Sequence, residues 1–364
     1  MKVGQLTNTL PGRRQKKKKA KYSISFQKTR RDHRRVFLFL PCMEKQALRI
    51  VFMGTPDFAV ASLKAIVEDG YKVVGVITAP DKEAGRGKKI RYSAVKKYAL
   101  SKDLLLLQPE KLKNEVFLHQ LKELNANLQV VVAFRMLPMV VWDMPEFGTF
   151  NLHASLLPKY RGAAPINHAI INGEELTGLT TFFLDKEIDT GRIIDQVQIP
   201  IDTKDSFETL HDRMMKAGAK LVIETIEKIR KGVADPISQS ELHKIDETLP
   251  AAPKIFKPFC QINWYKNSKE VYDFIRGLSP YPVAYSYMET SSEEKILTKI
   301  YSADYELAGH SDQPGNIFSD GKNYIKVAAK DGYIHILELQ IPGKKRLSTD
   351  EFLRGFHEDM ILFS

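Results

Sequence analysis

Asn151 and His153 stand two positions apart, and their side chains suit chemistry on a carbonyl group. A carboxamide NH2 can donate a hydrogen bond to a developing oxyanion, and an imidazole can move a proton near pH 7. Residues 148–153 are typical of a short strand, in which side chains two positions apart leave the same face. We therefore expect both groups to lie side by side at the end of a strand. Two turn residues bonded to nearby backbone are the alternative for so short a motif.

The segments around this pair predict a doubly wound, mostly parallel α/β sheet. The Val-rich residues 128–134 are typical of a strand buried on both faces. Residues 48–53, 58–68 and 72–77 form a strand–helix–strand pattern. The turn Gly54-Thr55-Pro56-Asp57 lacks the Gly-x-Gly-x-x-Gly spacing of a dinucleotide site, which argues against a nicotinamide cofactor.

A longer motif surrounds the pair. The string Asn151–Gly162, Asn-Leu-His-Ala-Ser-Leu-Leu-Pro-Lys-Tyr-Arg-Gly, resembles the active-site signature of the 10-formyltetrahydrofolate-dependent formyltransferases. Residues 185–191 match the family's second signature, Asp-x-x-Ile-Asp-Thr-Gly, whose later aspartate is catalytic and is here Asp189. The likeness runs from about residue 49 to residue 355. It is fullest to the members that act on methionyl-tRNA.

The resemblance implies formyl transfer from 10-formyltetrahydrofolate to the α-amino group of methionine on initiator tRNA. Asn151 would donate to the oxyanion, and His153 would shuttle protons or polarise the formyl oxygen. Asp189 would orient His153, favour its protonated form and hold a bridging water. No metal is required, because His and carboxylate residues at zinc-ligand spacing are absent. Neither cysteine lies near the signature, which argues against a cysteine acyl-enzyme.

The resemblance also predicts two parts of a folate site. One wall would consist of four consecutive residues, Ser155, Leu156, Leu157 and Pro158. Arg135, Met136 and Leu137 look like the Met-Arg-Ile-Leu loop of the glycinamide enzymes, whose backbone faces the pteridine. Many members that act on tRNA have a Tyr-Gly-type pair where this chain has Phe134-Arg135. The role of the Arg135 side chain is therefore left open.

Two basic segments are candidates for contacts to tRNA. Glycines flank Arg86 in the polar loop 78–92, and Lys88 and Lys89 follow. Such glycines let the backbone approach a phosphate closely. The string Ala-Gly-Arg-Gly-Lys-Lys resembles the insertion loop that grips the acceptor end of tRNA, which sugar and glycinamide-ribotide formyltransferases lack. The second basic segment is Lys344, Lys345 and Arg346. Solvated loops are the alternative for both.

The chain divides into four predicted parts. They are a basic, disordered extension (1–42), a formyltransferase catalytic domain (43–232), a linker (233–253) and an OB-like, tRNA-binding β-barrel domain (254–364). The linker lacks periodicity and holds three prolines. In the last part, a helix from Ser268 to Arg276, capped by Gly277, precedes mostly short strands. These include a hairpin around Asp331-Gly332, and such strands are typical of a small barrel.

The net charge of +11 belongs to the extension, which holds thirteen of the 55 Lys/Arg and one of the 44 Asp/Glu. The other 322 residues carry 42 bases and 43 acids, so affinity of this body for nucleic acid must come from local patches.

No apolar run approaches the ~20 residues of a membrane span. The two cysteines fit a reducing, cytoplasmic setting. We expect a monomer without membrane contact.

The extension has three interpretations. We favour Met43, five residues before the first strand, as the natural start, which makes residues 1–42 an upstream in-frame extension. An organelle transit peptide and a solvated tail that attracts RNA are the alternatives.

Two other functions stay open at this point. A formyltransferase acting on an amino-sugar nucleotide would share nearly the whole string Asn151–Gly162, although the loop Ala84–Lys89 argues against it. A non-catalytic protein that binds tRNA or folate is the other class. The set of Asn151, His153 and Asp189 argues against that class, because a binding module has no need of all three.

Overall fold

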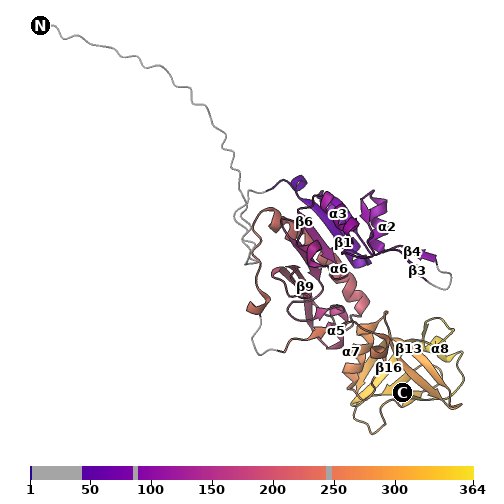
Figure 1. Ribbon diagram of the computed structural model, residues 1–364. Coiled ribbons are helices and arrows are strands. Elements are labelled where there is room, and N and C mark those ends of the chain that lie inside the picture. The colour runs from indigo at the N-terminus through magenta and orange to yellow at the C-terminus, as the bar shows by residue number, and fades with distance from the viewer. Residues whose placement is uncertain (2–42, 85–88, 243–247) are drawn as a thin grey trace. The chain divides into compact units, whose positions relative to one another are not determined.

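The computed structural model describes Met1 and residues 43–84, 89–242 and 248–364. The chain divides into a unit Met1–Val36 and a unit Phe37–Ser364, and every element named below belongs to the second unit (Figure 1). The predictions for the extension and for Arg86 and Lys88 fall outside the described residues.

The first large sheet has seven strands in the order β10–β9–β7–β6–β1–β2–β5. Their bounds are β1 (Arg49–Gly54), β2 (Lys72–Ile77), β5 (Leu106–Leu107), β6 (Leu128–Val132), β7 (Thr149–His153), β9 (Leu176–Phe183) and β10 (Ile193–Pro200). The five strands from β5 to β7 run parallel, and β9 and β10 add an antiparallel edge. The predicted doubly wound, mostly parallel sheet is confirmed.

Helices cover both faces of this sheet because its central strands are apolar on both sides. Ile50 and Phe52 of β1 pack into a core cluster with side chains of α1, α2, α5 and α6, whereas Val51 and Met53 pack with those of α3 and α4. The helices are α1 (Asp57–Glu68), α2 (Ala94–Ser101), α3 (Glu115–Glu123), α4 (Met139–Trp142), α5 (Pro165–Ile171) and α6 (Phe207–Arg230), after a short 3-10 turn η1 (Lys45–Ala47).

The strand order reverses beside β1. From β1 the chain moves outward to β2 and β5, and it then returns to β6 and β7 on the other side. In an open α/β sheet, ligands bind in the crevice at the carboxyl ends of the strands that flank such a switch point. Pro56 follows β1, Phe134 follows β6 and His153 ends β7, so all three belong to that edge.

The polar loop predicted for residues 78–92 contains a small hairpin. Strands β3 (Lys82–Ala84) and β4 (Lys89–Arg91) pair antiparallel, with Ala84 opposite Lys89. Three residues per strand are too few to produce a recognisable alternation, which is why the sequence gives no sign of them.

The predicted linker makes strand contacts with the first part of the chain. Its strand β11 (Ala251–Ala252) pairs in parallel with β8 (Arg161–Gly162), and a 3-10 turn η2 (Gln239–Glu241) lies earlier in the same segment. A backbone pair between Ile193 and Ile237 adds two mutual hydrogen bonds of 2.8 Å.

The second large sheet is antiparallel, in the order β14–β15–β16–β13–β12–β18, with β17 paired to β16. Its strands are β12 (Ala284–Thr290), β13 (Lys295–Leu307), β14 (Ile317–Ser319), β15 (Ile325–Ala328), β16 (Gly332–Gln340), β17 (Leu347–Ser348) and β18 (Met360–Phe363). The two ends of the sheet meet, because Asn316 bridges Leu362 and the Phe363 N–H donates to the Gly315 carbonyl at 2.9 Å. This near-closure confirms the predicted small barrel. Most of these strands are short, as predicted, although β13 has 13 residues and β16 has nine.

The helices of the last part are η3 (Lys257–Cys260), α7 (Ser268–Leu278) and α8 (Thr349–Leu353). Gly277 was predicted to cap a helix, but it lies inside α7. A Cβ at this position would lie 2.7 Å from Cγ1 of Ile171 and 3.2 Å from the Asn167 carbonyl oxygen. The glycine therefore permits the close approach of α7 to α5. Among the helices that the structure describes, none is long and apolar enough to cross a membrane.

Candidate active site

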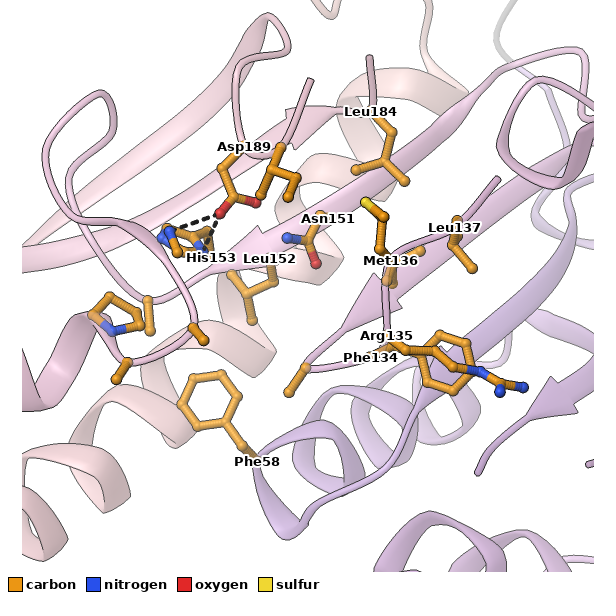
Figure 2. A pocket seen from close by; sticks show the side chains of 18 of the residues that line it. Phe58, Phe134, Arg135, Met136, Leu137, Asn151, Leu152, His153, Leu184 and Asp189 are labelled. Carbon is orange, nitrogen blue, oxygen red and sulfur yellow. Dashed lines mark hydrogen bonds and ion pairs between the residues drawn. The ribbon is translucent and has the colours of Figure 1, made fainter. Parts of the chain in front are cut away.

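A cavity of about 710 Å³ lies at the carboxyl ends of β1, β6 and β7. Its lining includes Pro56 after β1, the loop after β6, and Asn151 and His153 of β7 (Figure 2). The loop Asp185–Asp189 after β9 lines it from the other side. The switch point of the sheet therefore carries a pocket large enough for a small organic ligand.

Asn151 and His153 face this cavity together, as predicted from the alternation of a strand. Strand β7 runs between β6 and β9, with Asn151 opposite Val131 on one side. The Asn151 side chain is half-buried in the lining of the cavity, where its carboxamide N–H groups can donate to a ligand. Figure 2 shows this side chain pointing into the space between His153 and Met136.

The hydrogen bonds of His153 fix its neutral tautomer. Its Nε2 lies 2.9 Å from the Tyr160 carbonyl oxygen, which can only accept, so Nε2 carries the hydrogen. Nδ1 then holds a lone pair in the neutral ring, and it lies 3.8 Å from Oδ2 of Asp189. The histidine is 6% exposed. A proton arriving at Nδ1 would meet a carboxylate in a largely water-free environment, where the attraction of opposite charges is strong.

Asp189 comes from a loop with a strained backbone. Its φ of 55° is in the left-handed region, which is uncommon for a residue other than glycine. Oδ2 accepts a hydrogen bond of 3.0 Å from the Gly162 N–H, which fixes the carboxylate near the imidazole. Gly191 closes the turn, because a Cβ there would lie 1.7 Å from the Phe183 carbonyl oxygen.

These three side chains can perform acid–base chemistry on a carbonyl compound. The imidazole can take and return a proton at Nδ1, and the Asp189 carboxylate can stabilise the imidazolium that results. The Asn151 N–H groups can stabilise an oxyanion that develops in the cavity. All three sit within the lining of one cavity, which the sequence predicted for the pair and, through the resemblance, for Asp189.

The loop after β6 contributes to the cavity, but the Arg135 guanidinium does not point into it. Arg135 donates to the carbonyl oxygens of Pro109 and of Glu110, the latter at 2.8 Å. Burial lowers the pKa of this guanidinium below its usual range. Met136 and Leu137 both line the cavity, the first 74% and the second 8% exposed. The Arg135 side chain therefore ties the loop to the backbone of residues 109–110.

The stretch from Ser155 to Pro158, predicted as a wall of the folate site, lies outside the lining of this cavity. Ser155 is buried and donates to the Lys159 carbonyl at 2.7 Å, while Leu157 packs against Phe182. Pro158 is buried as well, whereas Leu156 is half-buried.

The basic residues predicted to contact tRNA are described only in part. Lys89 begins β4. Lys344 and Lys345 are exposed in the turn between β16 and β17, where Gly343 has a φ of 75°. Arg346 forms an ion pair with Glu338 and lies 4.6 Å from the centre of the Tyr301 ring. Part of its charge is therefore already compensated.

Comparison with known proteins decides the family. The model of the formyl transferase family matches residues 48–226, and that of the formyl transferase C-terminal domain matches residues 254–357. A methionyl-tRNA formyltransferase of Bacteroides fragilis is 59% identical over 315 residues, which are 86% of this chain and 97% of that protein. The chain belongs to the methionyl-tRNA formyltransferase family. Another member, from Flavobacterium johnsoniae, is 54% identical over 313 residues, again 86% of this chain and 97% of its own length.

Solved structures of more distant formyltransferases share the fold of this member of the methionyl-tRNA formyltransferase family. The sugar 3N-formyl transferase WlaRD superposes with a TM-score of 0.58 at 24% identity, over 82% of this chain and 99% of that one. An N-formyltransferase from Helicobacter canadensis gives 0.57 at 23%, over 79% and 98%. These identities support the shared architecture alone.

Further cavity residues of this family member were missed from its sequence. Phe58 lies in the first turn of α1, and Phe207 and His211 lie in the first turns of α6. The His211 ring centre lies 5.3 Å from that of Phe58 and 5.4 Å from that of Phe207. Their spacing along each helix is that of ordinary core positions, so only the meeting of two helix starts at one sheet edge could have indicated their place.

Proposed function

We propose that this chain transfers the formyl group of 10-formyltetrahydrofolate to the α-amino group of methionine on initiator methionyl-tRNA. Relatives named methionyl-tRNA formyltransferases match it at 51–59% identity over nearly their whole length. The observation that supports formyl transfer is that Asn151, His153 and Asp189 line the same cavity. We assign the reaction to the cytoplasm and to a monomer, both of which stay predictions from the sequence.

The lining of the cavity fits a folate as donor. Met136, Leu137, Trp142 and Leu184 form an apolar side next to the Asn151 carboxamide, as a flat heteroaromatic ring requires. When bound there, the donor supplies the formyl carbon that the amine attacks. Arg135 acts in this proposal only by holding the loop that carries Met136 and Leu137.

The reaction needs a nucleophile, a place for negative charge and a proton for the leaving nitrogen. As the methionine amine forms its bond to the formyl carbon, Asn151 donates a hydrogen bond to the formyl oxygen, which gains negative charge. His153 accepts the proton lost by the amine at Nδ1, where Asp189 stabilises the imidazolium. His153 then returns that proton to N10 of the folate as the bond between that nitrogen and the formyl carbon breaks. Charge and protons balance over the cycle.

For the acceptor, we propose that basic segments grip the tRNA. Arg86 and Lys88 lie in the sequence between β3 and β4, outside the described residues, while Lys89 begins β4 and Lys344 and Lys345 are exposed elsewhere. Arg346 belongs to the second of these segments, although its pairing with Glu338 weakens its attraction for phosphate. Such contacts to phosphates position an RNA without reading its sequence.

A formylation assay with three acceptors tests the function. Charged initiator methionyl-tRNA, charged elongator methionyl-tRNA and a dTDP-linked amino sugar would each be incubated with 10-formyltetrahydrofolate and the enzyme. We expect the initiator tRNA to be formylated with by far the highest kcat/KM. Faster formylation of the amino sugar would overturn the assignment, and so would the absence of formyl transfer to any acceptor.

A further inference from the structure

The segment that follows α6 crosses the two turns that flank His153. We call its described residues 236–241 and 250–252 the strap. The strap pairs with β8 through Ala251 and Ala252, and with the start of β10 through Ile237. It was predicted to be a linker, but its hydrogen bonds go to the backbone around the candidate active site.

Both residues that present an oxygen to His153 have left-handed backbones. Tyr160, whose carbonyl accepts from Nε2, has a φ of 59°, and Asp189, whose carboxylate faces Nδ1, has a φ of 55°. Conformations of this kind cost free energy and persist only where surrounding contacts hold them. The strap supplies such contacts to each: the Tyr160 N–H donates to the Pro250 carbonyl at 2.6 Å, and the Asp189 carbonyl accepts from Gln239.

Gln239 is the residue of the strap that touches the Asp189 turn most closely. Its Nε2 donates to the carbonyl oxygens of Asp189, at 2.8 Å, and of Gly191, at 2.9 Å. Its Oε1 accepts from Nε and Nη2 of Arg161, at 3.1 and 2.6 Å. Carbonyls can only accept and a guanidinium can only donate, so the partners fix which end of the carboxamide is oxygen. The residue is 2% exposed.

These bonds close a ring around the Asp189 carboxylate. Gln239 holds the backbone of Asp189 on one side and the side chain of Arg161 on the other. The next residue after Arg161 is Gly162, whose N–H donates to Oδ2 of Asp189. A shift of Gln239 would therefore move the aspartate backbone and the donor of its carboxylate relative to each other.

We propose that Gln239 is a positioning residue for the reaction, which sets the Asp189 carboxylate against Nδ1 of His153. It touches neither cavity nor substrate and acts through Asp189 alone. This inference rests on the roles proposed above for His153 and Asp189. The inference also makes the strap part of the active site. The strap lies between the two family domains, of which the first ends at residue 226 and the second begins at residue 254.

The decisive variant is Gln239→Glu, which keeps the shape and the partnership with Arg161 but cannot donate to either carbonyl. We expect kcat to fall roughly tenfold to a hundredfold, since a displacement of about 1 Å in a catalytic group can cost that much, while the KM for the donor changes little. Gln239→Leu removes the same two donors without adding a charge, and it provides the test if the glutamate variant does not fold.

A matched control is Asn127→Asp, at the opposite end of β6. Its Nδ2 donates to the Ala47 carbonyl at 2.9 Å and its Oδ1 accepts from the Arg49 N–H at 2.7 Å, so the replacement removes one donor to a backbone carbonyl in the same way. We expect it to lower the melting temperature and to leave kcat unchanged.

The two proposals are separated by combining Gln239→Glu with Asp189→Asn under single-turnover conditions. If Gln239 acts through Asp189, the double variant should react at the rate of Asp189→Asn within about twofold, because the two losses do not add. Losses that multiply, or a Gln239 variant as active as the control, would overturn the positioning role. Wild-type turnover by Asp189→Asn would instead overturn the proposed catalytic role of Asp189, and the positioning role with it.

Discussion

The two sides of the cavity hold their reactive groups in different ways. Asn151 and His153 belong to β7, which is paired on both sides within the sheet, so the pleat alone aims them into the cavity. Asp189 belongs to a loop whose four preceding residues are exposed, and its own backbone is left-handed. The strand side is set by local geometry, whereas the loop side depends on hydrogen bonds from Gly162 and from Gln239, fifty positions later.

The largest effect on the strand side should come from Asn151→Ala. Loss of a single oxyanion donor lowers kcat by roughly 10²–10³. Stability should change little, because the side chain lines the cavity and is only half-buried. The contrasting variant is Asn114→Ala, which removes the side-chain cap of α3 and should cost about 1 kcal/mol of unfolding free energy with kcat unchanged. Steady-state kinetics and denaturant unfolding of both variants measure the contrast; an Asn151 variant that is unstable but active would contradict it.

On the loop side, Gly191→Ala should lower kcat by roughly tenfold to a hundredfold, because the turn must open to admit a Cβ and the aspartate moves with it. The donor KM should rise less than kcat falls. Gly309→Ala is the control, since a Cβ there meets nothing within 4 Å. Equal kinetics for the two variants would show that the turn tolerates displacement.

A smaller effect is expected at the loop after β6, which Arg135 ties to the backbone of Pro109 and Glu110. Arg135→Ala frees the loop that carries Met136, and a loss of about 1 kcal/mol in donor binding would raise the Kd roughly fivefold. Arg49→Ala is the matched control variant. Arg49 also donates to two carbonyl oxygens, those of Leu124 and Asn125, but it lies at the opposite end of the sheet. Titration of donor binding should separate the two; a similar Kd for both would remove the anchoring role of Arg135.

The smallest effect on catalysis should appear away from both sides, at the end of α6. The hydrogen bond from Arg230 lowers the pKa of Glu227 from 4.5 to about 2, with a further hydrogen bond from Tyr71. A folded-state pKa below the unfolded one adds stability above about pH 4.5 that is lost as pH falls towards 2. Glu227→Gln should therefore cost about 1–2 kcal/mol at pH 7 and progressively less in acid, with kcat unaltered. Thermal melts of both proteins from pH 7 to pH 2.5 test this; a constant difference would contradict it.

The sequence predicted the strand side of the site from simple rules. Buried Val-rich segments gave the central strands, and a spacing of two placed Asn151 and His153 on one face. Asp189 was reached only through the resemblance of its loop, because an Asp-Thr-Gly turn is ordinary turn chemistry by itself. Local rules could not have indicated that its backbone is held from the strap.

The features that sequence reasoning missed have a common physical cause. Gly277, near the end of a helix, looked like a cap, although its real constraint is the neighbouring α5. Ser155–Pro158 follow His153 closely in the chain and yet lie outside the lining of the cavity, so their place in a folate site stays a prediction. Gln239 lies in a segment without periodicity, where its type and spacing carry no signal. In each case the deciding contact is between residues far apart in sequence, which patterns within a short window do not contain.

The central claim is that groups from a strand and from a loop act together on one formyl group. The most direct measurement is the single-turnover rate of formylation of initiator methionyl-tRNA, with enzyme and donor saturating, for the wild type, His153→Ala and Asp189→Asn. Both variants should be slower by at least ~10²-fold while donor binding stays close to that of the wild type. A rate near that of the wild type in either variant, or a loss explained entirely by weaker donor binding, would contradict the claim.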